Sequence, residues 1–193
     1  MATTANTASH GSSQRSPIVA AWVDQGIGEA GMHKYIKDRF GTLSSSISQW
    51  LFLDSSDDFT AYLDKNQNVR LISVMSGGMS RLLVPQHSHH AQFHSAYVFC
   101  VDTERARKTM DGEVKVKGIF NIEDDLYEQM ADDLAKVLLE DGIALAKLDQ
   151  RSAARKNYEE AKRLINTQAN RLKDDEKKAR LAEINGRIDQ LLA

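Results

Sequence analysis

Five short apolar segments, separated by segments with helical spacing, constrain this 193-residue chain more than any other feature. They are rich in Val, Ile, Tyr and Phe and span residues 18–23, 47–53, 69–75, 96–101 and 114–120. Each is too short for an ordinary helix, and strands that alternate with helices form a mostly parallel sheet covered on both faces. Such burial explains why the segments are apolar throughout. The sequence therefore predicts an α/β fold with a five-stranded, doubly wound parallel sheet.

The composition changes near residue 125 and divides the chain into unlike parts. Residues 1–16 consist mainly of small polar residues and are predicted to be a disordered leader. Residues 17–125 hold 11 of the 13 aromatic residues, whereas residues 126–193 carry 26 charged side chains, 13 of each sign. We predict a sheet domain over residues 17–125 and a helical region over residues 126–193, with Asp124 or Asp125 as the cap of its first helix.

The net charge of −2 and the single cysteine exclude several classes of protein. A nearly neutral chain offers no basic footprint for nucleic acid. The chain contains neither a secretory signal nor the run of about 18 apolar residues that a membrane helix needs, so we expect a cytoplasmic protein. One cysteine forms no internal disulfide and no Cys-based zinc site. We predict no cofactor.

The strand ends carry the residues of a candidate ligand site, because doubly wound sheets bind ligands at the C-terminal ends of their strands. Asp24 follows the first segment, Ser76-Gly77-Gly78 follows the third, and Lys117 lies around the fifth. With Trp22-Val23-Asp24, this order of elements resembles the receiver domains of phosphorelay signalling over residues 17–125. The resemblance implies a CheY-like fold and a signalling ancestry.

The chain departs from the receiver pattern at two positions. Receivers keep an acidic pair after the first strand and a phosphoacceptor Asp after the third, whereas here Asp24 has no acidic neighbour and Ser76 stands at the acceptor position. We therefore interpret the domain as a pseudo-receiver without aspartyl phosphotransfer. It is also similar to a receiver-like module that precedes tetratricopeptide repeats or ADP-ribosyltransferase domains in multidomain eukaryotic proteins, through Ser76-Gly77, Leu83-Val84-Pro85, Tyr97-Val98-Phe99-Cys100 and the residues from Lys115 to Phe120. That likeness implies a regulatory or recognition module.

The turn from Ser76 to Ser80 permits two interpretations. Its glycines would let a phosphate approach backbone N–H groups at a helix N-terminus, with Asp24, Ser76, Gly77, Gly78 and Lys117 around the anion. Glycines at such turns can equally serve the turn alone. A TIR-like NAD hydrolase would need a Glu on the following helix, and residues 77–96 contain none.

Four of the six histidines lie in residues 87–94. His90 and His94 would share a face of a helix and could bind zinc. The alternative is an exposed loop, with Pro85 ending the preceding helix. Cys100 is predicted to be a small buried hydrophobe inside its strand, and its pairing with His94 as a nucleophile is the weaker alternative.

The helical region resembles the 34-residue tetratricopeptide pattern from Ala135 onward. The matching residues are Leu138, Gly142, Leu145, Ala154, Tyr158 and Ala161. Gly142 and Ala154 are small so that two helices can approach closely. Asp141 stands where Leu is usual, and Asn166 where Pro often ends the repeat. A microtubule-interacting-and-trafficking type of bundle and a generic hairpin are the alternatives, and a helix over residues 174–192 would cover the unit.

One repeat cannot bury its own apolar faces. The tail must therefore pack on the sheet domain, pair with a second copy or receive a protein partner. The face that needs burial comprises Leu138, Leu145, Tyr158, Ile165, Leu181 and Ile188. We predict a non-enzymatic signalling adaptor or regulator. The alternatives are a nucleotide or NAD sensor or enzyme that uses the strand ends, and a structural subunit of a larger assembly.

Overall fold

A computed structural model of the protein describes residues 15–27, 34–167 and 172–192, so most of the predicted leader lies outside the described residues. The described part contains one five-stranded sheet in the order β2-β1-β3-β4-β5, and every neighbouring pair is parallel. The predicted doubly wound sheet is confirmed. Its strands are β1 (Ile18–Val23), β2 (Ile47–Leu53), β3 (Arg70–Ser76), β4 (Phe93–Phe99) and β5 (Val116–Phe120).

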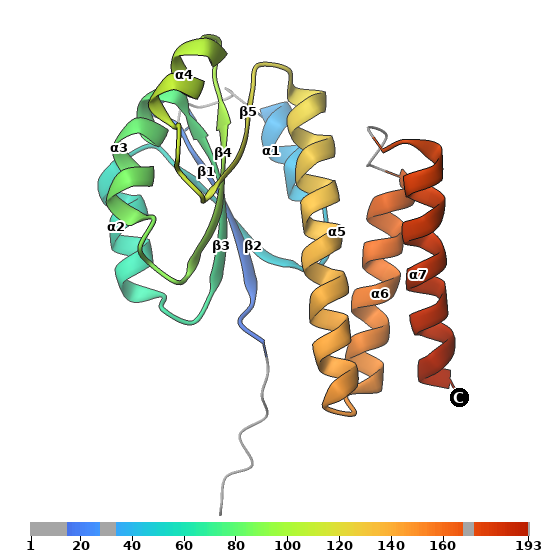
Figure 1. Ribbon diagram of the computed structural model, residues 1–193. Coiled ribbons are helices and arrows are strands. Elements are labelled where there is room, and N and C mark those ends of the chain that lie inside the picture. Colours follow the sequence, from blue (N-terminus) through green and yellow to red (C-terminus); the bar gives the residue numbers. More distant parts are fainter. Residues whose placement is uncertain (1–14, 28–33, 168–171, 193) are drawn as a thin grey trace, which may run out of the picture.

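Helices cover both faces of the sheet (Figure 1). α1 (Lys34–Gly41) and α5 (Glu123–Lys147) lie on one face. α2 (Ser56–Lys65), α3 (Gly77–His87) and α4 (Thr103–Thr109) lie on the other. Successive side chains of β1 point to opposite faces of the sheet and belong to two separate hydrophobic clusters. Ile18 and Trp22 pack on the face covered by α1 and α5, whereas Val19 and Val23 pack on the face covered by α2, α3 and α4.

Two predicted helix ends are wrong. Pro85 was expected to end its helix, but α3 continues to His87, and the N–H of Ser88 closes the last turn by donating to the Val84 carbonyl. Asp124 or Asp125 was expected to cap the tail, but α5 begins at Glu123 after Ile122, which offers no capping side chain. The carboxylates of Glu123, Asp124 and Asp125 lie instead in the first turn of α5, where they interact favourably with the positive end of the helix dipole. Arg39 pairs with two of them, Glu123 and Asp124.

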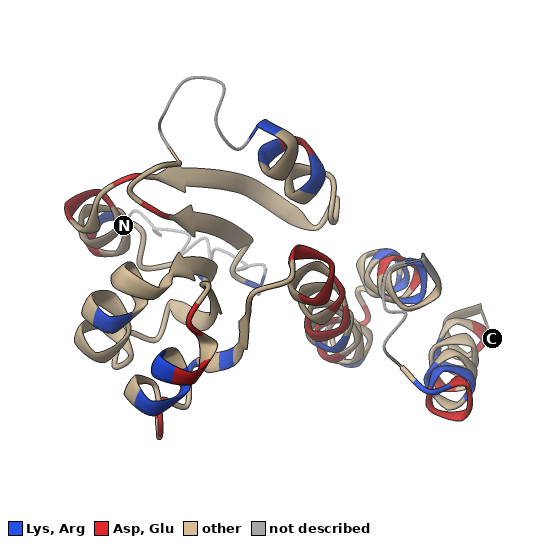
Figure 2. Cartoon of the chain, turned by 90° about the horizontal axis from the view of Figure 1, so that it is seen from above, with Lys and Arg blue, Asp and Glu red and all other residues tan. Residues whose placement is uncertain are grey.

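α5 is one 25-residue helix that serves both parts of the chain. Residues of its first half, such as Leu126 and Leu134, are buried in the cluster that covers the sheet, while its second half packs along α6 (Arg151–Thr167). The predicted division near residue 125 therefore falls in the first turn of a helix that continues through both parts. Figure 2 shows α5, α6 and α7 side by side, with α5 nearest the sheet.

The helices α5 and α6 approach each other closely at Gly142, as the sequence predicts. A Cβ atom on Gly142 would lie 2.4 Å from Cε1 of Tyr158, so the ring occupies the space that a side chain would need. α7 (Asp174–Leu192) lies against α6 through the buried Ile184, in the range predicted for a covering helix. None of the helices in the described residues has the length and apolar character needed to cross a membrane.

Candidate functional site

The order of the strands reverses between β1 and β3, and this switch point gathers most of the predicted anion-binding residues. Val23 pairs with Met75, so Asp24 and Ser76 leave neighbouring strand ends, and Gly77 and Gly78 begin α3. Lys117 does not join them. It lies three residues before Phe120, the residue at the end of β5, and β5 is the far edge strand of the sheet.

The side chains at the switch point serve local structure. Asp24 accepts a hydrogen bond from the Gly26 N–H at 2.9 Å, and the Ser76 hydroxyl accepts one from the Met79 N–H at 3.5 Å as the N-cap of α3. A Cβ atom on Gly77 would lie 3.1 Å from Cβ of Cys100. Gly77 therefore permits the start of α3 to approach the end of β4, a packing reason that needs no bound phosphate.

Both acidic and basic side chains lie at this edge of the sheet. Asp24, Asp54 and Asp102 follow three of the strands, and Glu123 and Asp124 begin α5. Figure 2 looks down on this edge and shows acidic residues at strand ends and on the first turns of α5. These carboxylates repel a phosphate group, whereas Arg39 compensates Glu123 and Asp124 and the Arg81 guanidinium lies beside Gly77. The nucleotide interpretation gains no support from the arrangement.

Two apolar side chains stand exposed among these carboxylates. Val101 follows β4 and is 95% exposed, and Ile122 follows β5 and is 55% exposed. The Cys100 N–H donates to the Phe120 carbonyl at 2.8 Å, so the ends of β4 and β5 lie side by side. We call Val101, Ile122 and the neighbouring Asp102, Glu123 and Asp124 the strand-end patch.

The prediction that Cys100 lies inside a strand is wrong, because β4 ends at Phe99. Cys100 lies directly after β4, is partly buried, and its thiol donates to the Asp102 carbonyl at 3.5 Å. Burial, with a smaller contribution from Asp102, raises the pKa of this thiol, which opposes formation of a nucleophilic thiolate. His94 lies near the other end of β4, so the structure does not bring the two side chains together.

His90 and His94 do not share a helix, because His90 lies in the turn before β4 and His94 lies within β4. The imidazoles that do gather are those of His87, His89 and His90, and the ring centroid of His90 lies 5.4 Å from that of His87 and 4.2 Å from that of His89. Across the described residues, no group of three or more His, Cys, Asp or Glu side chains is arranged to hold a metal ion.

His87 is the buried member of this histidine group. Its Nε2 lies 3.0 Å from the Thr60 hydroxyl of α2, while its buried Nδ1 has no partner in the described structure. Burial, and then the neighbouring His90 and His89, lower the pKa of His87. These surroundings therefore favour the neutral form of the His87 imidazole, which lies between α2 and α3.

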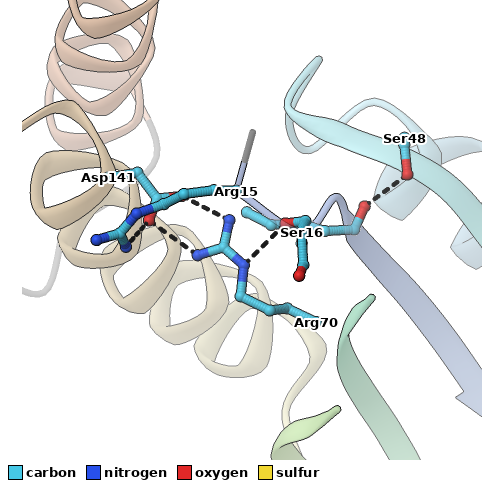
Figure 3. A network of polar contacts seen from close by, with 6 residues as sticks. Arg15, Ser16, Ser48, Arg70 and Asp141 are labelled. Carbon is cyan, nitrogen blue, oxygen red and sulfur yellow. Dashed lines mark hydrogen bonds and ion pairs between the residues drawn. The ribbon is translucent and has the colours of Figure 1, made fainter. Parts of the chain in front are cut away.

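A buried ion-pair cluster lies at the opposite edge of the sheet, where the strands begin (Figure 3). Asp141 of α5 is 3% exposed and accepts hydrogen bonds from Nη1 and Nη2 of Arg70 at 3.0 and 2.5 Å. Arg15 also pairs with Asp141, and Nε of Arg70 donates to the Ser16 carbonyl at 3.1 Å. Asp141, which interrupts the tetratricopeptide pattern, thus fastens the tail to the sheet.

Further polar contacts fasten the helices at other points. The Tyr97 hydroxyl of β4 donates to Asp133 of α5 at 3.0 Å. Burial, more than any other cause, raises the pKa of Tyr97 well above its usual range. In the loop before β2, the Ser44 hydroxyl donates to Glu160 of α6 at 2.5 Å. Arg180 of α7 pairs with Asp132 of α5. The tail is therefore attached through several elements.

The predicted interaction face is used within the chain. Leu138, Leu145, Tyr158 and Ile165 are buried in the cluster that α5 shares with the sheet, and Leu181 and Ile188 pack partly against it. Of the three ways to cover this face, the structure therefore adopts packing within the molecule.

Sequence reasoning missed Arg15, Arg70 and Val101. One signal for the ion-pair cluster was present, because Asp141 places a charge in the apolar stripe of a helix and Arg70 directly precedes the apolar segment of β3. Such a buried charge requires a partner. The exposure of Val101 had no signal, since valine in an apolar run is normally buried.

The order 2-1-3-4-5 with helices on both faces decides the fold. It is flavodoxin-like. Comparison of the chain with models of known protein families, with curated proteins and with solved structures found no match. The flavodoxin-like fold is also that of receivers, while the resemblance to a receiver and to a tetratricopeptide repeat rests on the motifs described above.

Proposed function

We propose that this protein is a non-enzymatic signalling adaptor, a pseudo-receiver with a tetratricopeptide-like tail, that docks a protein partner on the strand-end patch. The observation that supports it is the exposure of Val101 and Ile122 at adjacent strand ends. Apolar side chains beside charged groups are typical of recognition surfaces, where the apolar groups supply affinity and the charges select the partner.

The acidic rim of the patch specifies the chemistry of the partner. Asp102 directly follows Val101, and Glu123 and Asp124 directly follow Ile122, while Arg39 compensates part of this negative charge through its pairs with Glu123 and Asp124. The complementary partner is a protein segment in which an apolar side chain lies beside Lys or Arg. The helical tail contributes a scaffold rather than the docking face, because Leu138, Leu145, Tyr158 and Ile165 of its predicted interaction face are buried.

Site-specific photo-crosslinking in the source cell tests this proposal. A photoreactive phenylalanine analogue replaces Val101 in one variant and Val114 in a second. Val114 is a suitable control because it is 81% exposed but lies just before β5, at the opposite edge of the sheet. The proposal expects a defined partner to crosslink from position 101 and not from position 114, through a segment that carries Lys or Arg.

A charge variant separates docking from proximity. Substituting Ile122→Asp in the crosslinking background adds a carboxylate to the apolar part of the patch, and it should abolish the crosslink while the circular dichroism spectrum stays unchanged. Equal crosslinking from both positions, or a crosslink that survives Ile122→Asp, would contradict the proposal. A melting temperature raised by a nucleotide would favour the sensor alternative instead.

A further inference from the structure

A cleft lies beside the ion-pair cluster, between the beginning of the sheet and the α5–α6 hairpin. Its volume is about 520 Å³, a size that accommodates a small organic molecule. The residues lining it come from five segments of the chain, which include Ile18, Ser46, Arg70, Asp141 and Lys156. We infer that this cleft binds an organic anion that has an apolar body and one acidic group.

The apolar part of the ligand is specified by one wall of the cleft. Pro17 is exposed and Ala153 is partly buried in this wall, and the other apolar residues that line it, Ile18, Leu138 and Leu145, are buried. An apolar wall of this kind favours a molecule with an aliphatic or aromatic body over inorganic phosphate, because the body removes apolar surface from water.

The charge of the ligand is specified by the basic side chains. Arg15, Arg70 and Lys156 line the cleft, and Asp141 compensates one positive charge. Lys156 carries no ion pair within the described structure, and Arg15 uses a single nitrogen, Nη1, for Asp141. Burial, and then the nearby Arg70, Lys117 and Lys115, lower the pKa of His94, whereas Asp141 raises it.

Polar side chains that lack a partner complete the cleft. The hydroxyl of Ser46 and the side-chain amides of Gln150 and Asn157 make no hydrogen bond within the described residues, although all three residues are partly buried. Polar groups that converge on a hollow in this way supply orientation to a ligand whose body rests on an apolar wall. The site lies at the edge opposite the strand-end patch, so it is independent of the proposed docking function.

Fluorescence titration of the purified full chain with 1-anilinonaphthalene-8-sulfonate tests the inference, because this dye combines an aromatic body with one sulfonate. The uncharged N-phenyl-1-naphthylamine is the matched probe without the acidic group. We expect saturable binding of the anionic dye at one site, displacement by decanoate, and affinity for the uncharged dye lower by roughly tenfold, the loss of one charge-assisted hydrogen bond.

Variants assign the binding to the cleft. Ala153→Trp fills the hollow and Lys156→Glu reverses its free charge, so each should weaken the anionic dye by roughly tenfold or more. Lys178→Glu makes the same charge change on an exposed residue of α7 and should leave affinity unchanged. Asn157→Trp replaces Ala153→Trp if the latter does not fold. No saturable binding, equal affinity for both dyes, or binding that the cleft variants leave unaltered would overturn the inference.

Discussion

The ion pair between Asp141 and Arg70 allows a quantitative test of how the tail is held. In Asp141→Leu, which restores the residue usual in the tetratricopeptide pattern, the Arg70 guanidinium loses its carboxylate. Its side chain is 21% exposed, so water solvates it only in part. Breaking a buried pair by removing one partner costs about 3–5 kcal/mol, and the partial exposure places this variant near 3 kcal/mol.

The reciprocal variant should cost less, and the double variant shows the coupling. Arg70→Met leaves Asp141 with Arg15, so we expect a loss of about 2 kcal/mol. Arg70→Met with Asp141→Leu replaces the buried pair by apolar side chains and should cost about 2 kcal/mol or less, which gives a coupling free energy of about 3 kcal/mol. Urea denaturation followed by circular dichroism and tryptophan fluorescence measures each free energy of unfolding.

An exposed pair provides the control for this cycle. Arg155 and Glu159 of α6 lie 2.8 Å apart, with side chains 52% and 54% exposed. Their coupling should not exceed about 0.5 kcal/mol, because solvent and salt screen exposed pairs. If the losses from Asp141→Leu and Arg70→Met were simply additive, or if both pairs gave the same coupling, the reasoning that Asp141 fastens the tail to the sheet would be refuted.

Two further predictions concern packing and pH. Gly142→Ala should destabilise the fold by about 1–3 kcal/mol, because its Cβ would meet the Tyr158 ring, whereas Gly186→Ala in α7, with nothing within 4 Å, should stabilise it by about 0.5–1 kcal/mol. Thermal unfolding compares them, and equal effects would contradict the close contact. The pKa values of His87 and His94 are lowered by burial, so below the unfolded value of about 6.5 the unfolded chain binds more protons than the folded chain. Stability should therefore fall as the pH drops from about 7 toward the folded pKa values. His87→Gln should reduce this slope in urea titrations at several pH values, and an unchanged slope would show that His87 remains free to protonate.

The sheet could be predicted from the sequence because its strands are short, apolar and separated by helical spacing. Residues 18–23 and 47–53 match β1 and β2 at both ends. The ends of α3 and α5 could not be predicted by the same reasoning, since a proline near the last turn and an uncapped first turn are tolerated when tertiary packing holds the helix. Apolar spacing and capping residues in the sequence therefore predicted which strands and helices form better than they predicted where the helices begin and end.

The candidate sites were predicted less well because they depend on three-dimensional placement. Asp24 and Ser76 come together as predicted, since neighbouring parallel strands end at one edge. Lys117 does not, because its level in β5 depends on strand register, which the sequence does not reveal. Arg70 and Asp141 lie 71 positions apart, so the charge of Asp141 in its apolar stripe indicates that it needs a partner but not which residue that partner is.

The continuity of α5 has a consequence for dissecting the protein into pieces. A chain that stops at residue 125 would lose the helix that covers Trp22, Val74 and Tyr97, so that fragment would expose one face of its sheet to water. A chain that stops after Lys147 would keep α5 over the sheet, but Leu138, Leu145 and the rest of the C-terminal half of α5 would lose their contacts with α6. Neither fragment retains a complete core. The tail is thus an inseparable extension of the sheet domain, and gain or loss of such a tail in evolution would require the surface of α5 to change together with it.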